Sequence, residues 1–559
     1  MAPGRRATLG DAPSHAAGPS PAGVRGELPH TVTALHDKPL LARLLVGAIV
    51  VLALWLHVHG ARGDLPWAYE SDEGEFAVLA IRMATYGDPN PGWFGHPGST
   101  VLYPLAAIFH VGNALEAGLP PWKVDPGLAA RVGGNPGKYF LLARLLTVLY
   151  AVAALPLVYG VARRAFDPAV GVLATWIALL SPMALTHAQM IRTDSAGLFY
   201  GMLALWLVLR VLDKPSLGRH VAAGLALGAA IGTRYFLVTF VPALVCADLV
   251  LWRRAAGDAS ERGRLLRVAV AALACVALGF FLTTPYFVLD FTTVWQNLSH
   301  EMREEHLGAD GLGFAGNLRW YLTSALPLSM PLTWLCFAVA GAVLAAWRRN
   351  AAAGLVALPA VLFLIAISTA SLHWQRWLIQ VTPLLAMFSA AGLACLARLL
   401  ANGAAGRFGL TRAVTTPVLL VVLALVFTAA PAAAYMRTAL RQGVPGTRIL
   451  AREWIERNVP AGTRIVADFY TAPLHDTQVP ADYHFALASD GTLEQYRAAG
   501  YRYAMISDAI YLRFFGEAKR YPREVKFYES LLRGGKLVQR FAPGPNGRGP
   551  TISLYDLQS

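Results

Sequence analysis

Apolar stretches recur along the chain between residues 39 and 436, separated by short polar segments. Most run for about 17 to 25 residues, long enough for a helix to cross a hydrocarbon layer about 30 Å thick. Lys and Arg cluster at alternate ends of the stretches, for example at Arg163-Arg164 and Arg253-Arg254. Because basic residues stay on the cytoplasmic side, this alternation predicts about 11 transmembrane helices. The predicted fold class is an all-α polytopic membrane protein.

The predicted crossings follow one path through the membrane. They lie near residues 39–59, 139–162, 169–188, 195–212, 220–233, 267–287, 352–370, 377–398 and 413–435, with two more that end near residues 252 and 347. An odd number of crossings predicts a cytoplasmic N-terminus and an external C-terminus in a cytoplasmic (inner) membrane. The first external loop, residues 60–138, is long. Its apolar stretch at residues 99–115 is expected to be re-entrant or interfacial.

The two ends of the chain differ from the membrane segment. Residues 1–38 are rich in Pro, Gly and Ala and predict a disordered cytoplasmic arm. Residues 440–559 regain charged residues and predict a small external soluble α/β domain. Its expected elements are helices at 450–458 and 524–533, strands at 463–469 and 503–507, and late strands. It has no Gly-rich phosphate loop and no nucleophile motif, so we expect a packing or acceptor-guiding cap.

Composition agrees with a lipid environment. Hydrophobic residues make up 55% of the chain and charged residues 15%, whereas soluble globular chains carry about 25% charged residues. The net charge of +14 lies largely between apolar stretches, which favours membrane lipid over nucleic acid as a partner. The four cysteines lie inside apolar stretches without metal-site spacing: Cys246, Cys275, Cys336 and Cys395.

The first external loop gathers carboxylates and aromatic residues. Asp72 and Glu73 belong to a run of four carboxylates that leads into a predicted helix. Asp88 follows, and then a segment of aromatic residues that contains His96. A solvated helix N-terminus explains an acidic run by itself. Aromatic faces pack on sugar rings, however, and a carboxylate can act as a general base on a hydroxyl, so the combination favours a sugar site.

Other ionisable residues fall at the same predicted side of the membrane. Arg192, Asp194, Arg234 and Arg376 lie at the ends of apolar stretches. Ionisable residues at membrane depth are costly and usually line a site. The guanidinium fork matches phosphate oxygens, so the three arginines are candidates for binding a lipid phosphate. Each could instead anchor a helix end or pair with a carboxylate such as Asp194.

A predicted external helix contains a further candidate pair. His300 and Glu304 lie one helical turn apart, a spacing that can bind a divalent metal. The spacing is not the two-histidine pattern of zinc proteases. A charged amphipathic helix on the membrane surface explains the same residues.

Several motifs, taken in order, resemble the GT-C fold glycosyltransferases of the protein O-mannosyltransferase and aminoarabinose-transferase type over most of residues 39–400. The matching segments are Asp72-Glu73, Gly87-Asp88, His96-Pro97, Ser181-Pro182, Arg192-Thr193-Asp194, Thr233-Arg234-Tyr235 and Arg376-Trp377 with Pro383. The sequence departs from relatives that carry Glu-Lys before the proline of the first loop, because Gly95-His96 stands there.

The resemblance implies transfer of a sugar from a polyprenyl-phosphate donor to an acceptor hydroxyl on a protein, lipid or polysaccharide at the outer face. By resemblance, Asp72 is the base or acceptor-positioning residue, with Glu73 in support. We expect the transfer to be an inverting displacement, because no side chain is placed to form a covalent sugar intermediate. The family has metal-containing and metal-independent members, so the resemblance leaves a divalent metal cofactor open.

Two other functions fit parts of the pattern. A transporter or lipid-carrier flippase would also have many helices and few buried charges, but such proteins often show internal repeats, and none is seen here. A membrane scaffold would account for the tail and leave the acidic loop unexplained. The clustering of charges at one side and the long first loop favour the enzyme.

Overall fold

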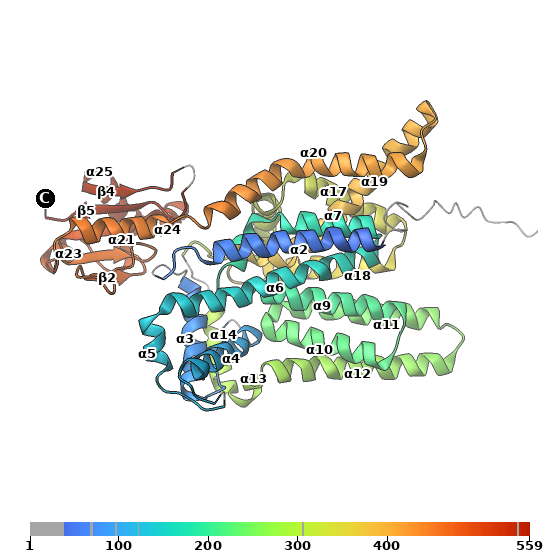
Figure 1. Ribbon diagram of the computed structural model, residues 1–559, viewed down its shortest axis with the longest axis horizontal. Coiled ribbons are helices and arrows are strands. Elements are labelled where there is room, and N and C mark those ends of the chain that lie inside the picture. Colours follow the sequence, from blue (N-terminus) through green and yellow to red (C-terminus); the bar gives the residue numbers. More distant parts are fainter. Residues whose placement is uncertain are drawn as a thin grey trace, which may run out of the picture.

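A bundle of long helices carries a small α/β domain at one of its ends (Figure 1). The computed structural model describes residues 39–66, 71–95, 98–120, 122–303, 307–544 and 547–558. The predicted N-terminal arm lies outside these residues and stays a prediction. The all-α membrane bundle and the terminal α/β domain expected from the sequence are confirmed.

The described residues contain eight helical segments that are long and apolar enough to cross a membrane. They are α2 (Pro39–Ala61), α6 (Pro136–Ala165), α9 (Asp194–Asp213), η1 (Tyr235–Phe240) continued by α11 (Val241–Arg254), α12 (Ala259–Thr283), α18 (Ala351–Ser368), α19 (Thr382–Phe408) and α20 (Arg412–Arg441). Two bent pairs raise the number to ten if each pair is one span. They are α7 (Pro168–Leu179) with α8 (Pro182–Ala188), and α15 (Gly313–Trp320), η2 (Tyr321–Ala325) and α16 (Leu326–Ser329) with α17 (Leu332–Trp347).

The eight helical segments and the two bent pairs match ten of the eleven predicted crossings. The remaining predicted segment is helix α10 (Leu217–Thr233), which has only 17 residues. It stops because Arg234 takes an extended backbone conformation, after which the chain continues as η1. Helix α10 lies between α9 and α12 within the bundle (Figure 1).

Close packing of α10 on α12 depends on glycine. A Cβ added at Gly224 or Gly228 would collide with backbone oxygens of α12, and one added at Gly279 would collide with the backbone of α10. Gly224 and Gly228 are four residues apart, so they lie on one face of α10. Small residues at this spacing let helix backbones approach in a membrane, where van der Waals contact drives association.

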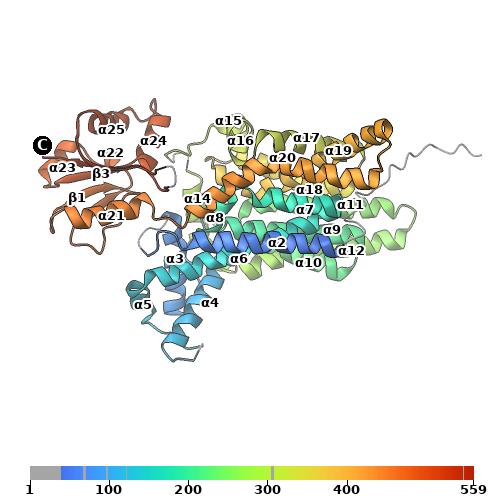
Figure 2. The same cartoon turned by 45° about the horizontal axis from the view of Figure 1, so that its top comes forward.

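The first long loop forms a helical subdomain beside the bundle (Figure 2). It consists of α3 (Ser71–Tyr86), α4 (Ser99–Glu116) and α5 (Leu128–Gly134). Apolar residues of α3 and α4, including Phe76, Leu102 and Phe109, form a core together with residues of α5, α6 and the start of α9. Helix α4 is not among the segments that qualify as spans, which agrees with the expectation that this stretch does not cross. Helices α13 (Tyr286–Leu289) and α14 (Phe291–Glu301) lie near the same end of the bundle (Figure 1).

The C-terminal domain is built on a five-stranded sheet with strand order β2-β1-β3-β5-β4. Strands β1, β2 and β3 are parallel, and β5 runs antiparallel to β3 and β4. The strands are β1 (Ile465–Asp468), β2 (Ala481–His484), β3 (Tyr503–Ser507), β4 (Lys536–Phe541) and β5 (Ile552–Asp556). The helices are α21 (Thr447–Asn458), α22 (Leu487–Asp490), α23 (Leu493–Ala498), α24 (Asp508–Gly516) and α25 (Pro522–Gly534).

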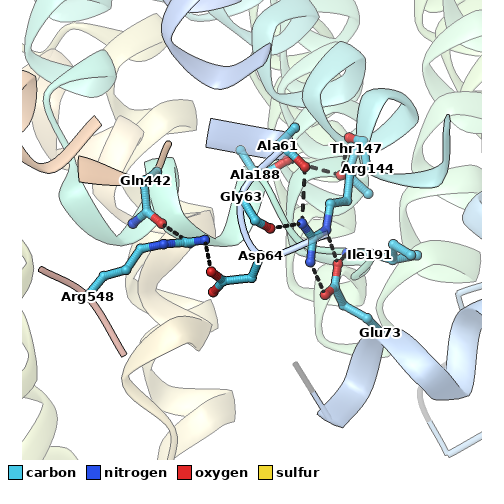
Figure 3. Close-up of polar contacts among 10 residues, drawn as sticks. All are labelled: Ala61, Gly63, Asp64, Glu73, Arg144, Thr147, Ala188, Ile191, Gln442 and Arg548. Atoms are coloured by element: carbon cyan, nitrogen blue, oxygen red, sulfur yellow. Dashed lines mark hydrogen bonds and ion pairs between the residues drawn. The ribbon is translucent and has the colours of Figure 1, made fainter. Parts of the chain in front are cut away.

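Ion pairs dock this domain on the bundle end. Arg548 pairs with Asp64 at 2.7 Å and donates to the Gln442 side chain at 3.0 Å (Figure 3). On a second contact, Arg520 pairs with Asp310 at 2.6 Å. Because Asp64 and Asp310 belong to loops of the membrane part, the two contacts place the domain over the end of the bundle.

Candidate active site

A cavity of about 1230 Å³ lies where the bundle end meets the C-terminal domain. Its lining comes from α3, α14, η1 and the 3-10 helix η3 (Gln375–Gln380) of the membrane part, and from α21 and α24 of the C-terminal domain. Aromatic side chains line much of it: Tyr235, Phe236, Trp295, Trp374, Trp377, Tyr470 and Phe485. Such faces can pack on sugar rings while polar groups orient the hydroxyls.

Asp72 lies at the wall of this cavity, in the first turn of α3. Its carboxylate pairs with Arg192 at 3.0 Å and with Arg376 at 3.5 Å. The Asp72 side chain is 33% exposed, whereas the two arginine side chains are 10% and 16% exposed. The carboxylate is therefore reachable from the cavity and is held by guanidinium groups that are mostly buried.

Arg192 precedes α9 and lines the same cavity. One of its terminal nitrogens lies 3.3 Å from His187 Nδ1. Its Nε is buried and has no hydrogen-bond partner among the described residues. A buried donor without a partner costs about 1–3 kcal/mol, so an oxygen of a bound ligand would be stabilised there.

A second ion pair lies deeper, between Asp194 at the start of α9 and Arg234. Arg234 lies at the break between α10 and η1, and this break turns its side chain towards α9. The amide of Gln380 donates to the Asp194 backbone carbonyl at 3.0 Å, which ties η3 to the same turn. Arg234 lines the cavity, while Asp194 is buried and is not part of the lining.

Within the described part of the chain, arginines outnumber the carboxylates that they pair with at the bundle end of the cavity. Arg192, Arg234 and Arg376 pair there with Asp72 and Asp194. Burial, followed by the charge of Arg192, lowers the pKa of Arg376, and the two carboxylates oppose this shift. A buried, imperfectly neutralised cation is stabilised by an incoming anion. The arrangement can therefore bind a phosphate group.

Glu73 has a different position from its neighbour Asp72. Its carboxylate is fully buried and accepts two hydrogen bonds from Arg144, at 2.8 and 2.7 Å, and one from the Ile191 backbone N–H at 3.0 Å (Figure 3). Arg144 also donates to the backbone carbonyls of Ala61 and Gly63. Glu73 does not line the cavity; it anchors the first turn of α3 to α6 and to the segment before α9.

In the described part of the chain, the other candidate residues do not meet at the cavity. Asp88 is exposed, and its carboxylate accepts from the Asn90 backbone N–H in its own turn. Gly95 lines the cavity, but His96 lies outside the described residues. His300 is exposed, and Glu304 also lies outside the described residues. Within the described part of the chain, no three His, Cys, Asp or Glu side chains form a metal-binding group.

Residues of the C-terminal domain that the sequence did not single out also line the cavity. They include Arg448 of α21, Tyr470 after β1 and Arg513 of α24. No local pattern marks them, because their place in the cavity depends on how the domain docks on the bundle. The domain is thus part of the cavity wall and not only a cover.

Comparisons with known proteins agree with this architecture. The family model described as dolichyl-phosphate-mannose-protein mannosyltransferase matches residues 130–280. ArnT from Cupriavidus metallidurans, in the apo state, has 15% sequence identity and a TM-score of 0.52, over 92% of this chain and 98% of that one. ArnT bound to undecaprenyl phosphate matches with 14% identity and a TM-score of 0.48, over 91% and 97% of the two chains.

A more distant solved structure is the Archaeoglobus fulgidus oligosaccharyltransferase tethered with an acceptor peptide. It matches with 13% identity and a TM-score of 0.48, over 90% of this chain and 74% of that one. Among curated proteins, none matches the sequence.

The bundle with its long first loop and the terminal α/β domain has the fold of the apo ArnT structure, and residues 130–280 match the model of a mannosyltransferase family. The chain is thus a polytopic membrane enzyme, as the sequence predicted.

Proposed function

We propose that the protein transfers a sugar from a polyprenyl-phosphate donor to an acceptor hydroxyl in the cavity beside Asp72. The observation that carries the proposal is the pairing of this partly exposed carboxylate with two buried guanidinium groups. The donor class is supported by the matched family, whose description names dolichyl phosphate, a polyprenyl phosphate. The acceptor is a hydroxyl of a protein, a lipid or a polysaccharide.

In this proposal the three arginines bind the donor phosphate. The phosphodiester of the donor carries one negative charge, and the polyprenyl phosphate that leaves gains a second. Arg192, Arg234 and Arg376 present preorganised positive charge where this second charge develops. Interactions that strengthen as charge develops lower the barrier, which is how such a site accelerates transfer.

Asp72 is the proposed general base. When phosphate oxygens bind to Arg192 and Arg376, they compete with Asp72 for the same N–H groups, which frees the carboxylate to accept a hydrogen bond from the acceptor. The acceptor oxygen then bonds to the anomeric carbon, the bond from that carbon to the phosphate oxygen breaks, and the proton passes to Asp72. Displacement in one step inverts the anomeric configuration.

We propose that the cavity opens on the external face of a cytoplasmic membrane, with the N-terminus in the cytoplasm. The loops at the opposite end of the bundle (Figure 1) are rich in basic residues: Lys214, Arg219, Arg253, Arg254, Arg262, Arg264, Arg348, Arg349, Arg407 and Arg412. Basic residues stay on the cytoplasmic side. The cavity and the C-terminal domain lie at the other end.

The test is transfer of radiolabelled sugar from polyprenyl-phosphate donors to envelope fractions, in membranes containing the native protein or Asp72→Asn at matched expression. Loss of a general base lowers the rate by about 10²- to 10⁴-fold. Asp88→Asn is the matched control, because Asp88 is an exposed loop carboxylate that does not line the cavity. Equal rates for native protein and Asp72→Asn would remove Asp72 from the mechanism.

We propose no metal ion in this mechanism, because guanidinium groups supply the positive charge that opposes the phosphate. We expect transfer by the native protein to be unchanged by EDTA. The measurement is the initial rate before and after chelation, with excess Mg²⁺ or Mn²⁺ added back. A rate that falls on chelation and returns with one of these metals would place a metal in the mechanism.

A further inference from the structure

One wall of the cavity is an irregular segment, residues 369–374, which joins α18 to η3. The segment leads directly into η3, which carries Arg376. Because the segment belongs to no helix and to no strand of the sheet, its buried backbone groups need hydrogen-bond partners from other elements. The elements that supply these partners therefore hold the wall in place next to Arg376. The residues of the segment that line the cavity are Thr369, Ala370, Ser371, Leu372 and Trp374.

Side chains of the helical run α15-η2-α16 supply partners for this wall. The buried amide of Asn317 donates to the carbonyls of Ser368 and Ala370, at 3.2 and 3.0 Å. One turn further along, the hydroxyl of Tyr321 accepts from the Trp374 N–H at 3.2 Å and donates to the Trp374 carbonyl at 3.4 Å. A tyrosine hydroxyl can donate and accept together, so one side chain holds both backbone groups of Trp374.

A π-helical turn, η2, begins at Tyr321 and precedes a further support. After the turn, the hydroxyl of Ser329 accepts from the side-chain amide of Gln375 at 3.3 Å and donates to the Ala325 carbonyl at 2.7 Å. A π-helical turn holds one residue more than an α-helical turn, and such turns are rare and are frequently found at functional sites. Across this turn, Tyr321 and Ser329 contact two consecutive residues, Trp374 at the end of the wall and Gln375 at the start of η3.

Trp374 connects Tyr321 to the arginines of the cavity. The Arg376 guanidinium lies 4.8 Å from the centre of the Trp374 ring, which is a cation–π contact. The same guanidinium pairs with Asp72 at 3.5 Å. Within the described part of the chain, Tyr321 is fully buried and is not part of the cavity lining. The contacts therefore lead from Tyr321 through Trp374 to Arg376.

We propose that Tyr321 is a positioning residue for the donor: its hydroxyl holds the Trp374 backbone, and the Trp374 ring in turn keeps the Arg376 guanidinium aligned with the donor phosphate. This inference rests on the proposed function, in which Arg376 binds that phosphate. A guanidinium binds phosphate strongly when two of its N–H groups point at two oxygens, a match that depends on the orientation of its plane. Without the hydroxyl, the Trp374 backbone and ring can shift, and the guanidinium loses this orientation.

The experiment measures binding of undecaprenyl phosphate to the full-length protein in detergent micelles. The readout is the rise of the thermal unfolding midpoint with lipid concentration, because a ligand that binds the folded state stabilises it. Tyr321→Phe removes one hydroxyl and keeps the buried ring. We expect the concentration for half-maximal stabilisation to rise on the order of threefold to tenfold, as for the loss of one hydrogen bond.

Tyr435→Phe is the matched control. Tyr435 is a tyrosine of α20 that is 1% exposed, and its hydroxyl has no hydrogen-bond partner among the described residues. Tyr435 also lies outside the cavity lining formed by the described chain. The control therefore removes a buried hydroxyl without changing the wall, and its half-maximal concentration should equal that of the native protein.

A double-mutant cycle distinguishes positioning from a general loss of stability. Arg376→Gln removes the guanidinium and weakens binding by itself. If Tyr321 acts through Arg376, adding Tyr321→Phe to Arg376→Gln leaves the half-maximal concentration unchanged, because no guanidinium remains to be aligned. Trp374→Leu tests the same route independently of any change at Tyr321. It removes the ring beside the guanidinium and should weaken binding by a similar factor.

Two outcomes would overturn the inference. One is an equal half-maximal concentration in native protein, Tyr321→Phe and Trp374→Leu. The other is that Tyr321→Phe weakens binding by the same factor with and without Arg376. Failure of the proposed function gives a different result, because undecaprenyl phosphate would then leave the unfolding midpoint of the native protein itself unchanged.

Discussion

Asp72 and Glu73 are adjacent carboxylates with opposite surroundings. Successive residues on a helix point about 100° apart, because an α-helix has 3.6 residues per turn. The first turn of α3 therefore directs Asp72 into the cavity and Glu73 into the protein, where Arg144 and the Ile191 N–H satisfy its oxygens. Glu73 acts on the site through position, since it fixes the turn that carries Asp72.

At the residue scale we predict that Glu73→Gln destabilises the protein more than the double variant Glu73→Gln, Arg144→Gln. The single change leaves the buried Arg144 without its charge partner, which costs about 3–5 kcal/mol because that side chain is only 6% exposed. The measurement is the thermal unfolding midpoint of each variant in detergent. A single variant as stable as the native protein would show that the pair does not anchor α3.

Candidate residues were predictable from sequence where membrane depth makes charge costly. Arg192, Arg234 and Arg376 stood out because each lies at the end of an apolar stretch, and Asp72 because it belongs to a carboxylate run in a loop rich in aromatic residues. The structure places all four at the cavity. The separate surroundings of Glu73 depend on which face of α3 packs against α6, and a run of carboxylates in a sequence does not contain that information.

At the scale of elements, most helices and strands could be predicted from the length and the periodicity of the apolar stretches. The strand expected at residues 503–507 forms as β3, and the helix expected at 524–533 forms within α25 (Pro522–Gly534). Helix α10, which forms at the crossing predicted for residues 220–233, has 17 residues and ends where Arg234 leaves the helical conformation. Where the helix stops depends on the contact of Arg234 with Asp194, which links residues far apart in sequence.

The contact of α10 with α12 gives a prediction for this scale. Gly228→Ala should destabilise the bundle by about 1–3 kcal/mol, because the new methyl group meets the backbone of α12 and the helices must separate. Gly218→Ala is the matched control: it lies on the same helix, and an added Cβ has nothing within 4 Å. Unfolding midpoints compare the two, and equal values would contradict the close approach.

At the scale of the whole molecule, docking of the C-terminal domain decides what the cavity is. Arg513 and Tyr470 enter the site because the domain docks on the bundle, through contacts that include the pairs of Arg548 with Asp64 and of Arg520 with Asp310. The sequence could predict the existence of this domain from the return of charged residues. It could not predict the docking, because both ion pairs join residues that are hundreds of positions apart or lie in loops without a regular pattern.

The second docking contact predicts a dependence on pH. Burial, together with a hydrogen bond to Asp310, raises the pKa of Glu517 to about 7 from an ordinary value of 4.5. A raised carboxyl pKa means that the docked state binds the proton more tightly. The stabilisation of docking by protonated Glu517 is fully present below pH 4.5 and is lost as the pH rises through about 7. Glu517→Gln keeps a hydrogen-bonding group that does not ionise.

We therefore expect the unfolding midpoint of the native protein to fall more steeply than that of Glu517→Gln as the pH rises from 4.5 to about 7. The measurement is a set of thermal melts of the two proteins across this range. Glu529→Gln is a control, because Glu529 lies on the surface of α25 and pairs with the exposed Arg533 in its own helix. Identical pH profiles for native protein and Glu517→Gln would show that the contact between Glu517 and Asp310 does not determine docking.

The cavity wall is shared between α3, near the start of the chain, and α24, near its end. During synthesis, all the membrane helices are made before the strands and helices that complete this wall. A nascent chain that has reached Arg441 has its bundle sequence but lacks Arg448, Tyr470 and Arg513. Inserted but unfinished chains therefore lack one side of the site, so the newly made enzyme has a complete site only after its last domain has folded.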